Sequence, residues 1–177
     1  MSDIVAMIPL KDGHELKYET LCSIAEQTVR IDIVCVSRPM KSLEGEKNKE
    51  GNGWLSMSEC RNIAKEDVLA RFDHDKFLLL NRDVVFSSAT DVEDMMRFLD
   101  EDVQYGLVAL NTRNRKIIEL ATSHVDIACS VVHRYALEHV VFHNDKGCNC
   151  NAVRSSIRRL DKRNKLRYLD KRQLKEI

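Results

Sequence analysis

Three polar side chains interrupt the most apolar stretch of the sequence. Residues 77–80 (FLLL) lead directly into Asn81, Arg82 and Asp83, and a second apolar run follows. A carboxylate at the end of a buried strand is a hard oxygen ligand that suits Mg²⁺ or Mn²⁺, and Asn81 can bond a ribose hydroxyl or a metal-bound water. The same triplet is typical of a turn, because Asn and Asp side chains form hydrogen bonds with their own backbone. The residues alone therefore leave a metal site and a simple turn both open.

Two further apolar runs of the kind that forms buried strands, residues 4–8 and 31–36, also end in polar residues. Helical periodicity separates the three runs, so strands and helices alternate, which favours right-handed βαβ units and a mostly parallel sheet. In open sheets of this kind, ligands bind beyond the carboxyl ends of the strands. We therefore expect one crevice where the three polar clusters meet. Its predicted lining is Pro9, Leu10, Lys11, Asp12, Ser37, Arg38, Asn81 and Arg82.

The rest of the chain supplies the elements that would position this crevice. The predicted helices cover residues 16–29, 58–69, 91–99, 134–140 and 152–160, and the additional strands cover 106–110, 124–133 and 166–169. Residues 40–53 are polar and glycine-bearing without periodicity, which indicates a loop able to order over a bound ligand.

The bulk composition is that of one globular domain. The chain has 177 residues, of which 44% are hydrophobic and 32% charged, so a core of two or three layers is expected. No apolar run approaches the roughly 20 residues that span a bilayer, and the N-terminus lacks a basic region before its first apolar run. We expect a cytoplasmic protein with no transmembrane segment. The phosphate-binding and dinucleotide fingerprints, which are rich in glycine, do not occur.

Cysteines and histidines give only weak signals of a metal site. The pair Cys148 and Cys150 is too small to complete a zinc site. His74 lies between two aspartates in a segment predicted to be a solvated loop, on the side of the sheet away from the crevice. Apolar or helical context predicts four buried free thiols, which are Cys22, Cys35, Cys60 and Cys129.

The charge is concentrated at the end of the chain. Residues 154–177 hold ten Lys or Arg against three acidic residues, a net charge of +7 in a chain that is neutral as a whole. Such a tail suits phosphates, an anionic membrane surface, a protein partner or nucleic acid, and it is equally the composition of a solvated helix face. Only Tyr168 could stack on a base, which disfavours nucleic acid.

Seven segments, spread over most of the chain, carry a resemblance when they are taken in order. They are IVAMIPLKDG, YETLCSIAEQTV, IDIVCVSRP, GWLSMSECRNIAKE, FLLLNRDVVF, HVDIACSVVHRYALEHVVF and VRSSIRRLDKRNKLRYL. Together they resemble the nucleotide-sugar glycosyltransferases of the GT-A fold, especially the inverting enzymes that build bacterial and viral polysaccharides. Arg61 and Asn62 stand where that family has an Arg-Asn pair, and residues 81–83 stand where it has Asp-x-Asp.

The resemblance implies a Rossmann-like three-layer α/β sandwich in a single domain, residues 1–177. Residues 1–110 would be the nucleotide-binding half and residues 111–177 the acceptor-side half. It implies a hexosyltransferase that moves a sugar from a nucleotide-diphospho-sugar to a hydroxyl of an unspecified glycan, lipid or protein. The donor site would include Arg61 and Asn62, and Asp83 with Asn81 would hold Mn²⁺ or Mg²⁺.

The sequence departs from the family where chemistry is concentrated. Ser37 and Arg38 stand where an aspartate usually ends the second strand, and the first carboxylate of Asp-x-Asp is replaced by the neutral Asn81. No carboxylate precedes the closing helix, which leaves Asp145 and Asp126 as candidates for the catalytic base. The alternatives are a GT-A protein that binds a nucleotide or a partner without turnover, and a nucleic-acid-binding protein that uses the basic tail.

Overall fold

The computed structural model describes residues 2–10, 14–37, 57–101, 105–111, 128–142, 165–173 and 175–176. In chain order the elements are β1 (Ile4–Leu10), α1 (Tyr18–Ala25), β2 (Ile31–Ser37), α2 (Met57–Arg71), β3 (Lys76–Leu80), β4 (Val84–Val85), α3 (Asp91–Asp100), β5 (Tyr105–Asn111), β6 (Cys129–His133), α4 (Arg134–His139), β7 (Lys165–Gln173) and β8 (Lys175–Glu176). The predicted loop 40–53 and the predicted helix 152–160 lie outside the described residues.

Six strands form the main sheet in the order β2-β1-β3-β6-β5-β7. The central strand β1 pairs in parallel with β2 and β3, whereas β6 is antiparallel to both of its neighbours, β3 and β5. Because β5 and β7 pair in parallel, five of the six strands run in one direction. The predicted α/β fold with a mostly parallel sheet is therefore confirmed. The short strands β4 and β8 make a separate antiparallel pair.

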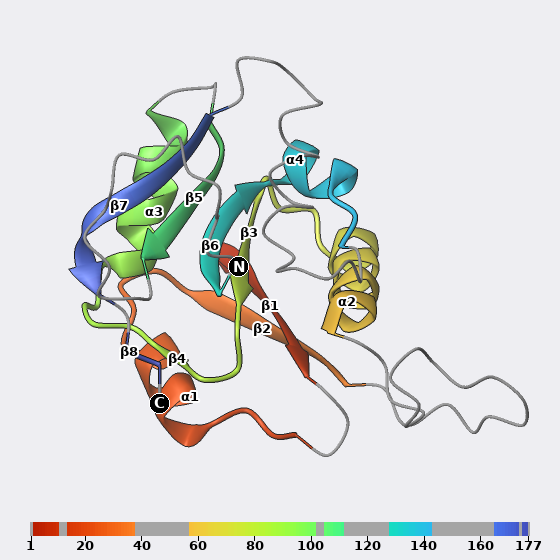
Figure 1. The fold of residues 1–177 in the computed structure, drawn as a ribbon, viewed down its shortest axis with the longest axis horizontal. Helices are drawn as coiled ribbons and strands as arrows, with labels where there is room; N and C mark the ends of the chain where they lie inside the picture. The colour runs from red at the N-terminus through yellow and green to blue at the C-terminus, as the bar shows by residue number, and fades with distance from the viewer. Residues whose placement is uncertain are drawn as a thin grey trace, which may run out of the picture.

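Helices cover both faces of this sheet and make the three layers (Figure 1). One face packs against α1 and α3 through alternating residues such as Ile4, Ile8 and Leu78. The opposite face, which includes Met7 and Phe77, packs against α2 and α4. Every residue of β1 is buried, so this strand is apolar along its whole length instead of alternating.

Two polar side chains, of Gln27 just after α1 and Asp91 at the start of α3, order the entrance to α3. The amide of Gln27 donates to the Ser88 carbonyl oxygen (2.9 Å) and accepts a bond from the Val92 N–H (3.1 Å). The Asp91 carboxylate, fully buried, accepts bonds from the N–H groups of Ser87 (3.0 Å) and Ser88 (2.9 Å). These bonds satisfy backbone donors at the helix entrance, and those of Gln27 also tie the end of α1, which supports the candidate site described below, to this entrance.

Two sequence predictions outside the site need correction. Cys60 and Cys129 are buried as expected, but Cys22 is partly exposed and Cys35 is exposed. Cys35 lies on β2, at the edge of the main sheet, and it faces away from Val34, which packs toward α2. Cys148 and Cys150 lie outside the described residues.

The segment around His74 is only partly solvated. The ring of His74 is half-buried, lies edge-on to Phe72, and its Nε2 is 3.1 Å from Ser2 Oγ. It therefore has a packing role at the start of β1. Among the described helices, none has the length and apolar character that crossing a membrane requires.

Candidate functional site

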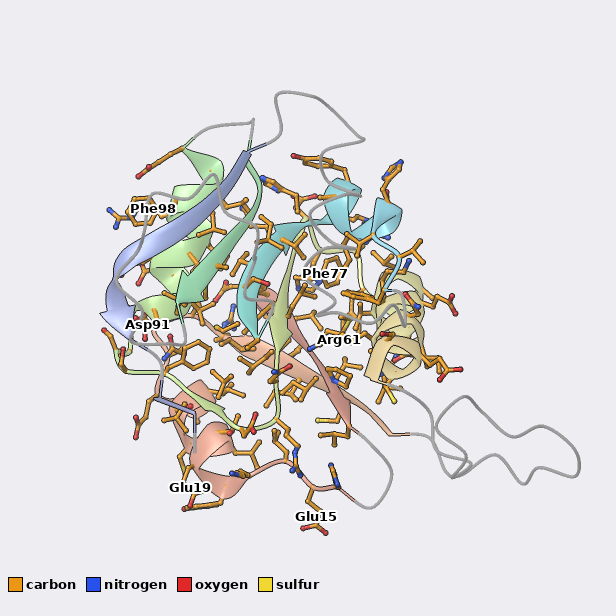
Figure 2. The ribbon with its side chains drawn as sticks, in the orientation of Figure 1. Glu15, Glu19, Arg61, Phe77, Asp91 and Phe98 are labelled. Atoms are coloured by element: carbon orange, nitrogen blue, oxygen red, sulfur yellow. The ribbon has the colours of Figure 1, made fainter. Side chains whose placement is uncertain are left out.

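A small hollow lies where β1 and β3 end, on the face of the sheet that α2 covers. Pro9 from the first predicted polar cluster and Asn81 from the third both line it, so the fold brings these two clusters together. Figure 2 shows Arg61 between α2 and the sheet, on the same side. The lining residues are Met7, Pro9, Arg61, Leu79, Leu80, Asn81 and Phe142.

The polar triplet after β3 is both the end of a buried strand and a tight turn. The Asn81 N–H donates to the Ala128 carbonyl oxygen (2.7 Å), which continues the pairing of β3 with β6. The Val84 N–H then donates to the Asn81 carbonyl oxygen (3.4 Å), which closes the turn. The hydroxyl of Thr20, fully buried on α1, donates to the Arg82 carbonyl oxygen (2.9 Å). The turn that presents Asn81 to the hollow is therefore braced by two other elements.

Arg61 reaches this turn from α2. Its Nη2 donates to the Asn81 side-chain oxygen Oδ1 at 2.9 Å, across 20 positions of sequence. The centre of its guanidinium lies 6.0 Å from the centroid of the Phe142 ring, within the range of a cation–π contact. One cation is thus held between an amide and an aromatic ring at the rim of the sheet.

The next residue on α2 fixes the opposite wall of the hollow. The Asn62 amide donates from Nδ2 to the Phe142 carbonyl oxygen (2.8 Å), and its Oδ1 accepts from the Phe142 N–H (3.0 Å). One turn further along, Lys65 donates to the Val140 carbonyl oxygen (2.8 Å), and burial lowers the pKa of Lys65. The segment after α4 is therefore clasped to α2 through its backbone. The geometry gives Asn62 a positioning role for Phe142.

The remaining predicted site residues are less completely placed. Leu10 and Ser37 end β1 and β2 at the same level of the sheet, and only the backbone of Ser37 belongs to the described part. Asp83 is partly buried in the turn after β3 and is not among the residues that line the hollow. The predicted residues that lie outside the described part of the chain are Lys11, Asp12, Arg38, Asp126 and Asp145.

The described side chains do not by themselves complete a site for a divalent metal. Within the described residues, no group of three or more His, Cys, Asp or Glu side chains is arranged to hold a metal ion. Of the two predicted ligands, Asn81 is neutral, and its side-chain oxygen already accepts a bond from a cation.

The comparisons with known proteins rest on structure, because no family model matches the sequence and no curated protein is similar to it. A mannosyltransferase from Pyrobaculum calidifontis, in complex with GDP-mannose and Mn²⁺, matches 99% of this chain with a TM-score of 0.71 and 15% identity. A fragment of TarS from S. aureus matches 98% of it with a TM-score of 0.65 and 13% identity. The chain has the GT-A glycosyltransferase fold.

The GT-A chain described here is shorter than these neighbours. It spans 56% of the mannosyltransferase and 60% of the TarS fragment. A third match, A197 from STIV, is nearer in length, with 85% of that chain covered at a TM-score of 0.59 and 14% identity. At these identities the similarity shows the fold alone, and the chemistry depends on the residues of this chain.

Sequence reasoning missed several residues that shape the site. Met7 and Leu79 line the hollow, and the period of two along a strand could have placed Leu79 on the same face as Asn81. Thr20 supports the turn and Phe142 forms a wall, but neither has a local signal, because their partners lie 62 and 80 positions away.

Proposed function

We propose that this chain binds a nucleotide-diphospho-sugar at the hollow beside β1 and β3 and transfers the sugar to an acceptor hydroxyl. The observation that carries the proposal is the match of the GT-A fold over 99% of the chain, with a TM-score of 0.71, to a mannosyltransferase solved with its nucleotide sugar. Ligands of open α/β sheets bind at the carboxyl ends of the strands, which is where Pro9, Asn81 and Arg61 meet.

The reaction is a displacement at the anomeric carbon of the donor. The acceptor oxygen forms the new glycosidic bond, the bond from that carbon to the diphosphate oxygen breaks, and the diphosphate keeps the electron pair. A carboxylate takes the acceptor proton, for which Asp145 and Asp126 remain the proposed candidates. Pro9, Leu10 and Arg82, with Lys11, Asp12, Ser37 and Arg38, are the proposed contacts of the nucleotide. The acceptor is a glycan, lipid or protein, and the basic tail is proposed to approach a membrane surface or a protein partner.

The sequence also predicted that a divalent metal assists the transfer, and the reaction above is written without that metal. Mn²⁺ accompanies GDP-mannose in the mannosyltransferase, whereas here Asp83 is the one carboxylate that follows β3 and Asn81 is engaged by Arg61. Asp83, with Asn81, remains the proposed ligand of Mn²⁺ or Mg²⁺, and the steps above are written without the metal.

A second candidate function is binding without turnover. The neutral Asn81 at the position of a family carboxylate favours it, since a chain that has lost catalysis can keep its fold and its ligand. The two functions predict the same binding and differ in product formation.

A titration followed by a transfer assay tests the proposal. The panel is GDP, UDP, CDP and ADP, followed by GDP- and UDP-sugars, and the first measurement is the change in NMR signals of the labelled chain. We expect shifts at Leu10, Arg61 and Asn81 and release of the nucleoside diphosphate from at least one donor. Shifts without release would favour binding alone, and shifts confined to residues 154–177 would reject the hollow as the nucleotide site.

A further inference from the structure

A buried serine hydroxyl lies in the middle of the main sheet. Ser130, on β6, is fully buried, and its Oγ has no hydrogen-bond partner within the part of the chain that the structure describes. A buried hydroxyl that has given up water without gaining a bond weakens the folded state, which is why such groups are rare outside functional sites. The position of Ser130 relative to the hollow therefore needs to be established.

The register of the sheet places Ser130 beside the hollow. Ser130 pairs with Leu79 of β3, and Leu79 pairs with Met7 of β1, so the three residues form one row across three strands. Met7 and Leu79 both line the hollow. Directly opposed residues of an antiparallel pair have Cβ atoms about 5 Å apart, so the serine lies next to a lining residue.

The Ser130 side chain points to the face of the sheet on which the hollow lies. Cys129 and Val131 pack on the face that α1 and α3 cover, and successive side chains of a strand point to opposite faces. Ser130 therefore faces α2 and α4, as the lining residues of its row do. On its other side the serine pairs with Ala109 of β5, whose methyl group takes up little of the space beside the hydroxyl.

The surroundings of this hydroxyl suit a sugar better than a phosphate. A pyranose ring has apolar C–H faces and hydroxyls around its edge, and here Met7, Leu79 and Phe142 supply apolar walls next to one serine hydroxyl. That hydroxyl can donate and accept, as a sugar hydroxyl can. A phosphate is charged and gains more from a cation than from one neutral hydroxyl. A single polar group in an apolar lining is also the arrangement that fixes the orientation of a ligand.

We propose that Ser130 binds a hydroxyl of the donor sugar and thereby contributes to the choice of that sugar. This inference rests on the proposed function, because the sugar is part of the ligand assigned to the hollow. Pro9 and Asn81 follow Met7 and Leu79 by two residues, so they line the hollow nearer to its rim, where the charged diphosphate stays, and the sugar reaches toward the serine. Because no described group bonds the Ser130 hydroxyl in the free chain, its bond to the sugar is gained without breaking another.

The test compares two affinities of the full-length chain by calorimetry in the presence of Mn²⁺. The ligands are GDP, UDP, CDP and ADP, and then GDP-mannose, UDP-glucose, UDP-galactose and UDP-N-acetylglucosamine. Ser130→Ala should weaken the binding of the preferred sugar nucleotide about three- to tenfold and leave the affinity for its nucleoside diphosphate within about twofold. The preference among sugars on the same nucleotide should narrow as well. In thermal melts without ligand, Ser130→Ala should raise the melting temperature by about 2–4 °C, because it removes an unsatisfied buried group.

A control and the possible outcomes separate the inference from the function on which it rests. Val131→Ala truncates the next residue of β6 on the opposite face, and it should lower the melting temperature but leave the ratio of the two affinities unchanged. A selective loss of sugar-nucleotide affinity in Ser130→Ala supports the inference. Unchanged affinities, or an equal loss for nucleotides with and without the sugar, overturn it and leave the proposed function standing. If the wild type binds no ligand of the panel, the proposed function fails as well.

Discussion

The clasp between α2 and the segment after α4 leads to a quantitative prediction. Asn62→Ala removes two hydrogen bonds, of 2.8 and 3.0 Å. It leaves the N–H and carbonyl of Phe142, a residue with a buried side chain, without these partners. Each bond contributes about 1 kcal/mol, and an unpaired, partly buried backbone group adds a penalty, so a loss of about 3 kcal/mol is expected. For a chain of this size the melting temperature should fall by about 6–12 °C.

Urea denaturation and thermal melting measure this loss. The dependence of the unfolding free energy on urea should stay the same, because the surface exposed on unfolding hardly changes. Glu66→Ala is the matched control, since Glu66 is an exposed residue of the same helix and its loss should matter by less than about 0.5 kcal/mol. A loss below about 1 kcal/mol in Asn62→Ala would refute the view that the clasp fixes the wall of the hollow.

Asn62→Asp separates the two halves of the clasp. The carboxylate keeps an acceptor for the Phe142 N–H but has no donor for the Phe142 carbonyl. The variant should therefore be destabilised at neutral pH. Below about pH 4 the carboxyl is protonated and regains a donor, so the difference from the wild type measured at the same pH should narrow. A difference that widens on acidification would contradict the assigned bond.

Three further predictions concern residues outside the clasp. Thr20→Val leaves the Arg82 carbonyl without its 2.9 Å bond, and should cost about 1–2 kcal/mol in thermal melts, whereas Thr20→Ser keeps the hydroxyl and should melt near the wild type. Gln27→Ala removes the bonds that join α1 to α3, and should cost about 2–3 kcal/mol by chemical denaturation; Gln27→Glu keeps only the acceptor and should lie between. Burial and the nearby Lys76 lower the pKa of His133 in the folded chain. The unfolded chain therefore binds more protons as the pH drops through about 6.5, and the folded state becomes less stable as the pH decreases. His133→Gln should flatten the decline in melting temperature between about pH 7 and pH 5, and an unchanged slope would exclude His133 as its source.

The sequence was sufficient where local pattern decides the structure. Residues 4–8 and 77–80 are continuous apolar runs because β1 and β3 are buried on both faces, and the run length alone predicts them as strands. Asp91 could be predicted to start a helix because acidic residues suit the first turn. The meeting of Pro9 with Asn81 follows from the parallel direction of their strands.

Non-local contacts decided the rest. The apolar segment before α4 predicts a strand but not the direction in which it pairs, so the antiparallel course of β6 has no local signal. The exposure of Cys35 depends on β2 lying at the edge of the sheet. The bond from Arg61 to Asn81 joins an ordinary helix residue to an ordinary turn residue, and only the tertiary fold brings them within reach. The predicted binding of a divalent metal by Asp83 and Asn81 stays a prediction.

The Asn62 clasp also bears on how this site can change over evolutionary time. Its two bonds end on the main chain of Phe142, which every amino acid except proline can offer in the same form. Mutations at position 142 are thus free to reshape the wall, and with it the choice of sugar or acceptor, while the attachment persists. Position 62 has no such freedom, so we expect divergent descendants of this chain to vary the wall and retain the asparagine.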